Sequence, residues 1–332
     1  MLTEQNKASD SVKVVGASNP PAGNQTLSKR QRKKRRYQRF KQNKTQVADG
    51  ELAGGAGAEA EVVSKGRAPA DSRRHAAVHG NYRRYYGYRL GQSFEEDPRL
   101  QVFERRWFAN RRCLDIGCNE GLVTLAVAAR FGAASMLGVD LDEHLIRNAC
   151  RHLREERTQA AARLAALAHP SAASAPGQEG STIAVGSMQR RVAVTAVRAL
   201  KATHFQLGDF LDLEAPTLGS VDTVLCLSVT KWVHLHHGDA GLAALFTRVA
   251  AALSPGGLLV LEPQPWRSYQ SAVGKLRRAG LALPPLDSLQ LRPEALPAYL
   301  AEQHGLRLLE RRQVGAAAPG FDRPLLVFQR NG

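Results

Sequence analysis

An acidic residue and two glycines mark a turn that could hold a ligand. The stretch DIGCNEG places Asp115, Gly117 and Gly121 between an apolar run and a helical pattern. Glycines at such a turn let the backbone approach a ligand and direct helix N–H groups toward it. The spacing D-x-G-x-x-x-G differs from the dinucleotide fingerprint and suits an amino-acid moiety better than a pyrophosphate. The alternative is a tight strand-to-helix connection that binds nothing.

Two further acids stand at the ends of later apolar runs. Asp140 closes MLGVD, a position where doubly wound folds use a carboxylate to accept hydrogen bonds from ribose hydroxyls. Asp209 in LGDF could accept from an adenine amino group, and Phe210 could cover the ring or serve only as core. Acids at three successive strand ends predict a nucleoside site.

Tyrosines and arginines are interleaved in GNYRRYYGYR, residues 80–89. Aromatic faces and guanidinium forks suit the bases and phosphates of a single-stranded RNA end. An aromatic cover over a sheet is an equally good interpretation of this spacing. Arg99, further along, is interpreted either as a cofactor carboxylate partner or as a surface arginine.

A second polar cluster, TKWVHLHHGD, follows an apolar run and is expected to form a loop at the edge where open α/β sheets place their sites. Lys231 could neutralise a terminal phosphate, or it could snorkel beside Trp232. Acid–base or solvent-exposed roles are favoured over a metal site for the three histidines of this cluster, His234, His236 and His237. The EPQPW stretch at 262–266 is either a rigid lip of the pocket or a strand terminator.

These residues need a scaffold that gathers strand ends at one edge. Apolar runs alternate with helical patterns, which is the signature of a doubly wound sheet with helices on both faces. Strands are expected at 112–116, 136–140, 204–207, 221–229, 258–263, 306–312 and 324–328, and helices at 121–131, 143–157, 240–253 and 293–304. The sequence therefore predicts an α/β protein with a Rossmann-like, seven-stranded sheet.

The 332 residues divide by composition. Residues 1–75 have too few large apolar side chains to offset the entropy of ordering and are expected to form a disordered arm. Within it, 29–44 contains ten Lys or Arg and no acid, or +10 of the net +16, which predicts a nuclear import signal or a nucleic-acid arm rather than a merely solvated tail. Residues 76–332 are expected to form one domain, with 158–202 a low-complexity insertion loop that starts as a helix.

Composition also excludes several classes of protein. No apolar run approaches the roughly 18 residues of a membrane span, and the first residues resemble neither a secretory signal nor a transit peptide. An intracellular protein is expected. The absence of any CxxC pair predicts reduced core thiols rather than a zinc ribbon for the four cysteines, Cys113, Cys118, Cys150 and Cys226.

Six stretches together resemble the RNA methylphosphate capping enzymes, a family whose best-known substrate is 7SK small nuclear RNA. They are NYRRYYGYR, LDIGCNEG, GVDLD, LCLSVTKWVHL, PGGLLVLEPQPW and GFDRPLLVF, and the match runs from about residue 79 to 329 without the insertion. The pair TKWVHL and LEPQPW is far more specific than any motif shared by all methyltransferases. The resemblance implies a class I fold that binds S-adenosylmethionine, with no metal.

Residue roles follow from the resemblance by position. Phosphate and substrate contacts, the catalytic set, would fall on Tyr85, Arg89 and Lys231. Cofactor contacts would fall on Tyr86, Arg99, Gly117, Cys118, Asn119, Asp140, Leu141, Asp209, Phe210 and Leu227, to which the turn analysis adds Asp115. The chain departs from the family in having Asp209-Phe210 in place of Asn-Tyr, and in a loop before Arg99 that is two residues longer.

The implied reaction is methyl transfer to the 5′ γ-phosphate of a small nuclear RNA in the nucleus. The implied partners are an RNA with a 5′ triphosphate and proteins of a ribonucleoprotein; no DNA or membrane partner is expected, and the catalytic domain is expected to be monomeric. Two alternatives remain open at this point. One is a catalytically silent RNA-binding scaffold, and the other is a methyltransferase that acts on another RNA end or on a protein.

Overall fold

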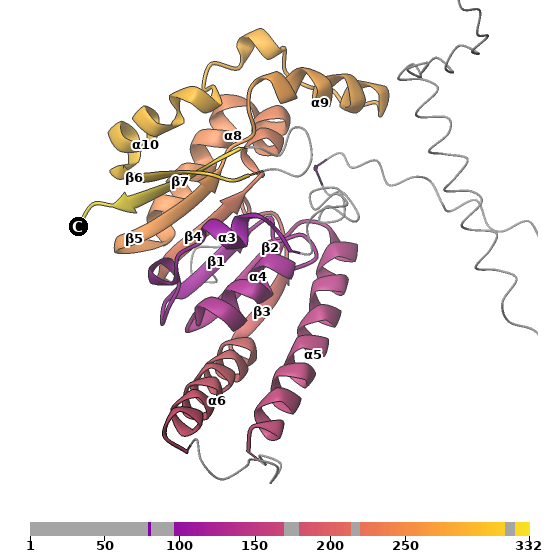
Figure 1. The fold of residues 1–332 in the computed structure, drawn as a ribbon. Coiled ribbons are helices and arrows are strands. Elements are labelled where there is room, and N and C mark those ends of the chain that lie inside the picture. Colours follow the sequence, from indigo (N-terminus) through magenta and orange to yellow (C-terminus); the bar gives the residue numbers. More distant parts are fainter. Residues whose placement is uncertain (1–78, 81–95, 169–178, 214–219, 316–322) are drawn as a thin grey trace, which may run out of the picture. The chain divides into compact units, whose positions relative to one another are not determined.

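A seven-stranded sheet forms the centre of the computed structural model, which describes residues 79–80, 96–168, 179–213, 220–315 and 323–332 (Figure 1). The strands are β1 (Arg112–Ile116), β2 (Ser135–Asp140), β3 (Thr203–Leu207), β4 (Val221–Leu227), β5 (Leu253–Glu262), β6 (Leu306–Gln313) and β7 (Pro324–Arg330). Their order is β3-β2-β1-β4-β5-β7-β6, and β7 runs antiparallel to both of its neighbours. The predicted α/β fold is confirmed.

The strand order reverses between β1 and β4, which pair in parallel. In open α/β sheets a ligand crevice forms outside the carboxyl ends of the strands at such a reversal. The chain leaves β1 at Ile116 and β4 at Leu227, so the residues that follow these two positions are placed at the crevice.

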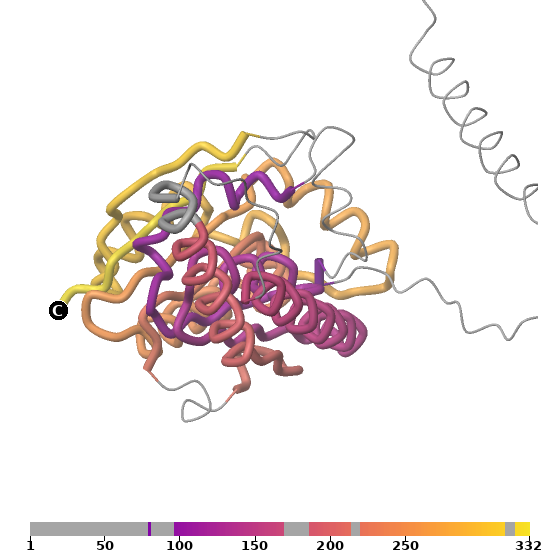
Figure 2. The backbone as a smooth tube through the Cα atoms, turned by 60° about the horizontal axis from the view of Figure 1, so that its bottom comes forward, coloured from indigo at the N-terminus to yellow at the C-terminus, as the bar shows by residue number. Residues whose placement is uncertain are grey.

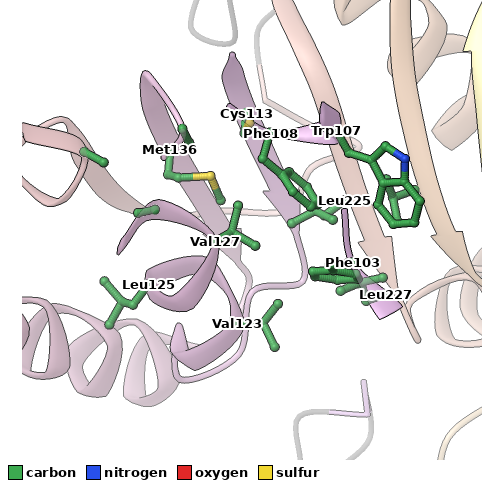
Figure 3. Close-up of a cluster of buried hydrophobic side chains, with 14 of the residues drawn as sticks. Phe103, Trp107, Phe108, Cys113, Val123, Leu125, Val127, Met136, Leu225 and Leu227 are labelled. Carbon is green, nitrogen blue, oxygen red and sulfur yellow. The ribbon is translucent and has the colours of Figure 1, made fainter. Parts of the chain in front are cut away.

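Both faces of the sheet are covered, as the nearly continuous apolar character of β1 and β4 requires. One face carries α4 (Leu122–Ala126), its π-helical continuation (Val127–Phe131) and α6 (Glu179–Lys201), and Figure 3 shows part of this core. The other face packs against α8 (Thr230–Ala252) and α10 (Leu296–His304).

The remaining helices lie at the periphery. Helix α5 (Glu143–Ala166) packs against α6 and β3 (Figure 1, Figure 2). Helix α9 (Arg267–Arg278) buries Tyr269, Ala272, Val273 and Leu276 in a small cluster with the first turns of α8. Short helical segments at Arg99–Val102 (α3), Arg105–Trp107, Leu286–Ser288 and Pro293–Ala295 complete the described elements.

Three sequence expectations are corrected. The stretch from Thr230 to His237 is not a loop but the start of α8, whose helical backbone is interrupted at Gly238 (φ 64°, ψ −166°). The predicted helix began only after that glycine. Within 158–202, the predicted helical start is confirmed, because α5 continues to Ala166 through an alanine-rich stretch that favours helix. The remainder is not only a loop, since α6 occupies Glu179–Lys201. Helix α9 was not predicted at all.

No helix in the described ranges is long and apolar enough to cross a membrane. The basic run at 29–44 and the predicted disordered arm lie outside the described residues.

Candidate active site

A cavity of about 570 Å3 opens at the carboxyl ends of β1, β2, β3 and β4, where the strand order reverses. Its charged lining residues fall into two groups. Two acids come from the ends of β2 and β3, and three cations come from α8, α9 and the segment before β7. The polar and charged side chains that line it are Asn119, Asp140, Asp209, Ser228, Lys231, Gln264, Lys275, Arg323, His79, His236 and His237.

The turn after β1 brings main chain to the cavity wall. Gly117 (φ 71°) and Asn119 (φ 53°) both have left-handed backbone. The N–H groups of Gly117 and Cys118 donate to the carbonyl of Val139 at 2.8 and 3.0 Å, which ties the turn to β2. A Cβ on Gly117 would lie 2.5 Å from a methyl group of Val229, so this close approach requires glycine.

Asp140 ends β2 with its carboxylate at the cavity. One oxygen accepts from the N–H of Asn119 at 2.9 Å and the other from the N–H of Asp142 at 3.0 Å. Burial raises the pKa of Asp140 above its usual value, although these backbone hydrogen bonds oppose the shift. The carboxylate is therefore held in one orientation, as hydrogen bonding to ribose hydroxyls requires.

The end of β3 supplies the remaining residues on the acidic side of the cavity. Asp209 lines the cavity, and one of its carboxylate oxygens accepts from the N–H of Leu211 at 2.9 Å. Phe210 is buried yet also lines the cavity, so it is both core and wall. Leu141 and Leu227 add apolar surface to the same lining.

Three predicted cofactor residues lie outside the cavity lining. Asp115 is buried and accepts from the Thr124 hydroxyl at 2.6 Å, and burial raises its pKa to about 6. Cys118 is buried behind the turn. Arg99 is only 2% exposed and pairs with Asp97 at 2.7 Å and Glu262 at 3.3 Å, so its interpretation as a surface arginine is wrong.

Lys231 lies on the cationic side of the cavity, in the first turn of α8. It is 7% exposed, and its ammonium lies 4.6 Å from the centroid of the Trp232 ring. Burial, together with the charges of Arg323 and Lys275, lowers the pKa of Lys231 to about 8. The ammonium therefore lies beside Trp232, as the alternative interpretation had it, but the side chain is buried and does not extend into bulk solvent.

A buried polar network supports Lys231, and sequence reasoning missed it. Ser228 has left-handed backbone (φ 64°), and its hydroxyl donates to Glu262 at 2.6 Å. The side-chain amide of Gln264 donates to the Ser228 carbonyl, and its oxygen accepts from the N–H of Lys231 at 3.1 Å. Arg323 donates to the Ser228 hydroxyl at 2.8 Å. Gln264 directly follows the apolar run LLVLEP, and Asp140 was identified because it stands at the end of such a run. The same placement could have identified Gln264 from the sequence.

The predicted histidine cluster divides. His234 is fully buried, with one ring nitrogen 2.6 Å from an Asp239 carboxylate oxygen and the other 3.3 Å from the Tyr269 hydroxyl, and this arrangement anchors α9 to α8. His236 lines the cavity and stacks on His79, with ring centroids 4.4 Å apart. Within the ranges that the structure describes, no three His, Cys, Asp or Glu side chains are grouped as metal ligands.

The segment before the core reaches the cavity at His79 and Gly80. A Cβ on Gly80 would lie 2.1 Å from the Trp232 indole nitrogen, so the main chain there packs directly on the ring. The predicted contacts Tyr85, Tyr86 and Arg89 lie outside the described residues and stay predictions.

The acidic half of the cavity suits a nucleoside cofactor. Asp140 and Asp209 could present acceptors to ribose and adenine groups, Phe210 presents an apolar face, and the main chain at Gly117 lines the same cavity. The strand order, with only β7 antiparallel, and this site together define a class I S-adenosylmethionine-dependent methyltransferase.

Comparison with known proteins gives the family. Residues 221–330 match the family described as Bicoid-interacting protein 3 (Bin3), and residues 113–176 match a methyltransferase domain. A protein of Arabidopsis thaliana named "Probable RNA methyltransferase" is 37% identical over 257 residues, which cover 76% of this chain and 80% of the plant protein.

Two relatives carry more specific names. The U6 snRNA methylphosphate capping enzyme of Drosophila melanogaster is 30% identical, covering 76% of this chain and 75% of the fly protein. The 7SK snRNA methylphosphate capping enzyme of Homo sapiens is 35% identical, but the chain covers only 39% of that longer protein. The chain belongs to this family of methylphosphate capping enzymes, as its motifs predicted.

Proposed function

We propose that this protein transfers a methyl group from S-adenosylmethionine to the 5′ γ-phosphate of a small nuclear RNA and so forms a monomethyl phosphate cap. The observation that carries the proposal is Lys231, a buried cation that lines the same cavity as Asp140 and Asp209. Asp140 and Asp209 would hold the cofactor on one side of this cavity, and the opposite side is cationic. The names of the fly and human relatives favour a phosphate as the methyl acceptor.

The bound cofactor supplies the methyl group as a sulfonium. The phosphate needs no strong base, because its second pKa is about 6 and it is already a dianion at neutral pH. With a pKa of about 8, Lys231 is mostly protonated there and attracts that dianion without taking part in proton transfer. The residues of this chain therefore act by binding and orientation.

Orientation is the larger contribution. Holding two reactants in line is worth roughly 7–11 kcal/mol of the barrier. Gln264 fixes the main chain at both Ser228 and Lys231, and the turn at Ser228 lies at the end of β4 between the two halves of the cavity. We propose that Tyr85 and Arg89 also bind the phosphates and that Tyr86 completes the cofactor site.

The setting of this reaction is proposed from sequence. The basic run at 29–44 fits nuclear import, and relatives that act on small nuclear RNAs agree with a nuclear role. Further proteins of a ribonucleoprotein are proposed partners, with a monomeric catalytic domain.

Methyl transfer to matched RNAs tests the proposal. Labelled cofactor is incubated with short RNAs that differ only in a 5′ triphosphate, monophosphate or hydroxyl end. Labelling of the triphosphate RNA is expected, and it should be absent when that RNA is treated with phosphatase before the reaction; Lys231→Ala should lose at least a hundredfold in rate with little loss of cofactor affinity. Unchanged turnover in Lys231→Ala would refute the role of this lysine. RNA and cofactor binding without labelling would instead indicate a silent scaffold.

A further inference from the structure

Three cations from distant parts of the chain line one side of the cavity. Lys231 begins α8, Lys275 belongs to the last turn of α9, and Arg323 precedes β7. They differ in depth: Lys231 and Arg323 are 7% and 8% exposed, whereas Lys275 is exposed to solvent. The cavity therefore has two cations within it and one at its mouth.

The acids of the cavity lie elsewhere. Within its lining, as far as the chain is described, the carboxylates are Asp140 and Asp209 at the ends of β2 and β3. Glu262, which approaches from behind, is fully buried and already accepts from Arg99 and the Ser228 hydroxyl. Helix α9 itself contains no acidic residue.

Three cations that face one cavity raise the local positive potential and so favour binding of an anion there. The lowered pKa of Lys231 reflects this, since Arg323 and Lys275 add to the effect of burial. The Ser228 hydroxyl accepts from one guanidinium nitrogen of Arg323, which fixes that group at the wall. An arginine fork held this way suits two oxygens of one phosphate, whereas a lysine acts as a point charge.

We propose that Arg323 and Lys275 are additional phosphate-binding residues and that they divide the triphosphate between them. Arg323, beside Lys231, holds the terminal phosphate, and Lys275 holds the bridging phosphates at the mouth. The terminal phosphate enters first because it must reach the methyl donor inside the cavity. Lys275 thereby makes the site sensitive to the length of the 5′ phosphate chain. This inference rests on the proposed function.

Lys275 has a competing structural role. Cations in the last turn of a helix are stabilised by its dipole, and α9 has Lys275, Arg277 and Arg278 there. That role would make Lys275 and Arg277 equivalent. The cavity distinguishes them, because Lys275 lines it and Arg277, although also exposed, does not.

Binding of two RNAs to the full chain tests the division. RNAs with a label at the 3′ end and either a 5′ triphosphate or a 5′ monophosphate are titrated against wild type, Lys275→Gln and Arg277→Gln. The ratio of the two dissociation constants is compared, because contributions from the body of the RNA cancel in it. Thermal unfolding of each variant confirms that α9 is intact.

Lys275→Gln is expected to weaken binding of the triphosphate RNA about tenfold and to leave the monophosphate RNA nearly unchanged, as for loss of one charge-assisted contact. Arg277→Gln should leave the ratio at its wild-type value. Arg323→Lys, which keeps the charge but loses the fork, should weaken both RNAs by a similar factor. An unchanged ratio in Lys275→Gln, or an equal change in Arg277→Gln, overturns the division.

Failure of this inference is separable from failure of the proposed function. If wild type methylates triphosphate RNA and Lys275→Gln keeps the wild-type preference for triphosphate over monophosphate RNA, only the proposed division of the phosphates between Arg323 and Lys275 is refuted. If wild type methylates no RNA 5′ end, the proposed function itself is lost.

Discussion

The charge on Lys231 should set the alkaline limit of methyl transfer. The usual pKa of lysine, 10.5, is lowered to about 8 by burial, Arg323 and Lys275. This difference means that the ammonium costs roughly 3 kcal/mol in the RNA-free protein. Below pH 8 the side chain is charged and attracts the phosphate. Above pH 8 it is neutral, so kcat/KM for RNA should fall about tenfold per pH unit.

The RNA complex should behave differently. A bound phosphate dianion favours the charged lysine, so it raises the pKa of Lys231 in the complex. Since kcat reports groups in the complex and kcat/KM those in the free enzyme, kcat should stay level to a higher pH than kcat/KM. On the acid side, both should fall below about pH 6 as the terminal phosphate takes up a proton.

Initial rates over pH 5.5–10, about the span these pKa values require, measure both parameters with a triphosphate RNA. Lys231→Arg is the matched control, because a guanidinium stays charged over this range. Whatever its absolute rate, its kcat/KM should lack the alkaline fall. A fall with the same midpoint in Lys231→Arg would refute the assignment, as would a wild-type profile that stays level to pH 9.5, well above the Lys231 pKa of about 8.

Three further predictions concern the cofactor half and the fold. Asp140→Ala should weaken cofactor binding about 10–100-fold, and wild-type affinity by calorimetry would contradict the ribose assignment. Gly117→Ala should cost at least about 1 kcal/mol in denaturant unfolding, because φ is 71° and the new methyl would meet Val229. Asp115→Asn should stabilise the protein at pH 7 by up to roughly 3 kcal/mol, because burial raises the folded-state pKa to about 6, and stability is lost as pH rises from 3.8 to 6. That gain should vanish below pH 4, and equal stabilities at pH 7 would show that Asp115 is not strained by its burial.

The central strands, such as β1 and β4, were predictable because burial on both faces leaves a simple apolar run. The bounds predicted for β1, 112–116, are those observed, and β2 begins one residue earlier than predicted. Helices at the periphery were harder. The apolar positions of α9, Tyr269, Ala272, Val273 and Leu276, have helical spacing, but dense arginine and lysine concealed them. The helix predicted at 240–253 is only the second part of α8, which begins at Thr230 and is interrupted at Gly238.

The cofactor half of the site was predictable for a related reason. Asp140 ends β2 and Asp209 lies two positions after β3, so their placement at the sheet edge follows from the strands alone. The cationic half joins α8, α9 and the segment before β7, and no local pattern links Lys275 or Arg323 to Lys231. Ser228 could not be recognised either, because its left-handed backbone is stabilised by Glu262 and Gln264, which lie more than thirty positions away.

The hydrogen bonds through Glu262 have a consequence for measurements made on residues outside the cavity lining. Arg99, 163 positions earlier in the chain, donates to the same carboxylate oxygen that accepts from Ser228, and Ser228 in turn accepts from Arg323. A ligand that immobilises Arg323 therefore also restrains the short helix that carries Arg99. Amide hydrogen exchange in that helix should slow when an RNA end binds. It therefore reports binding without a label near the reacting atoms.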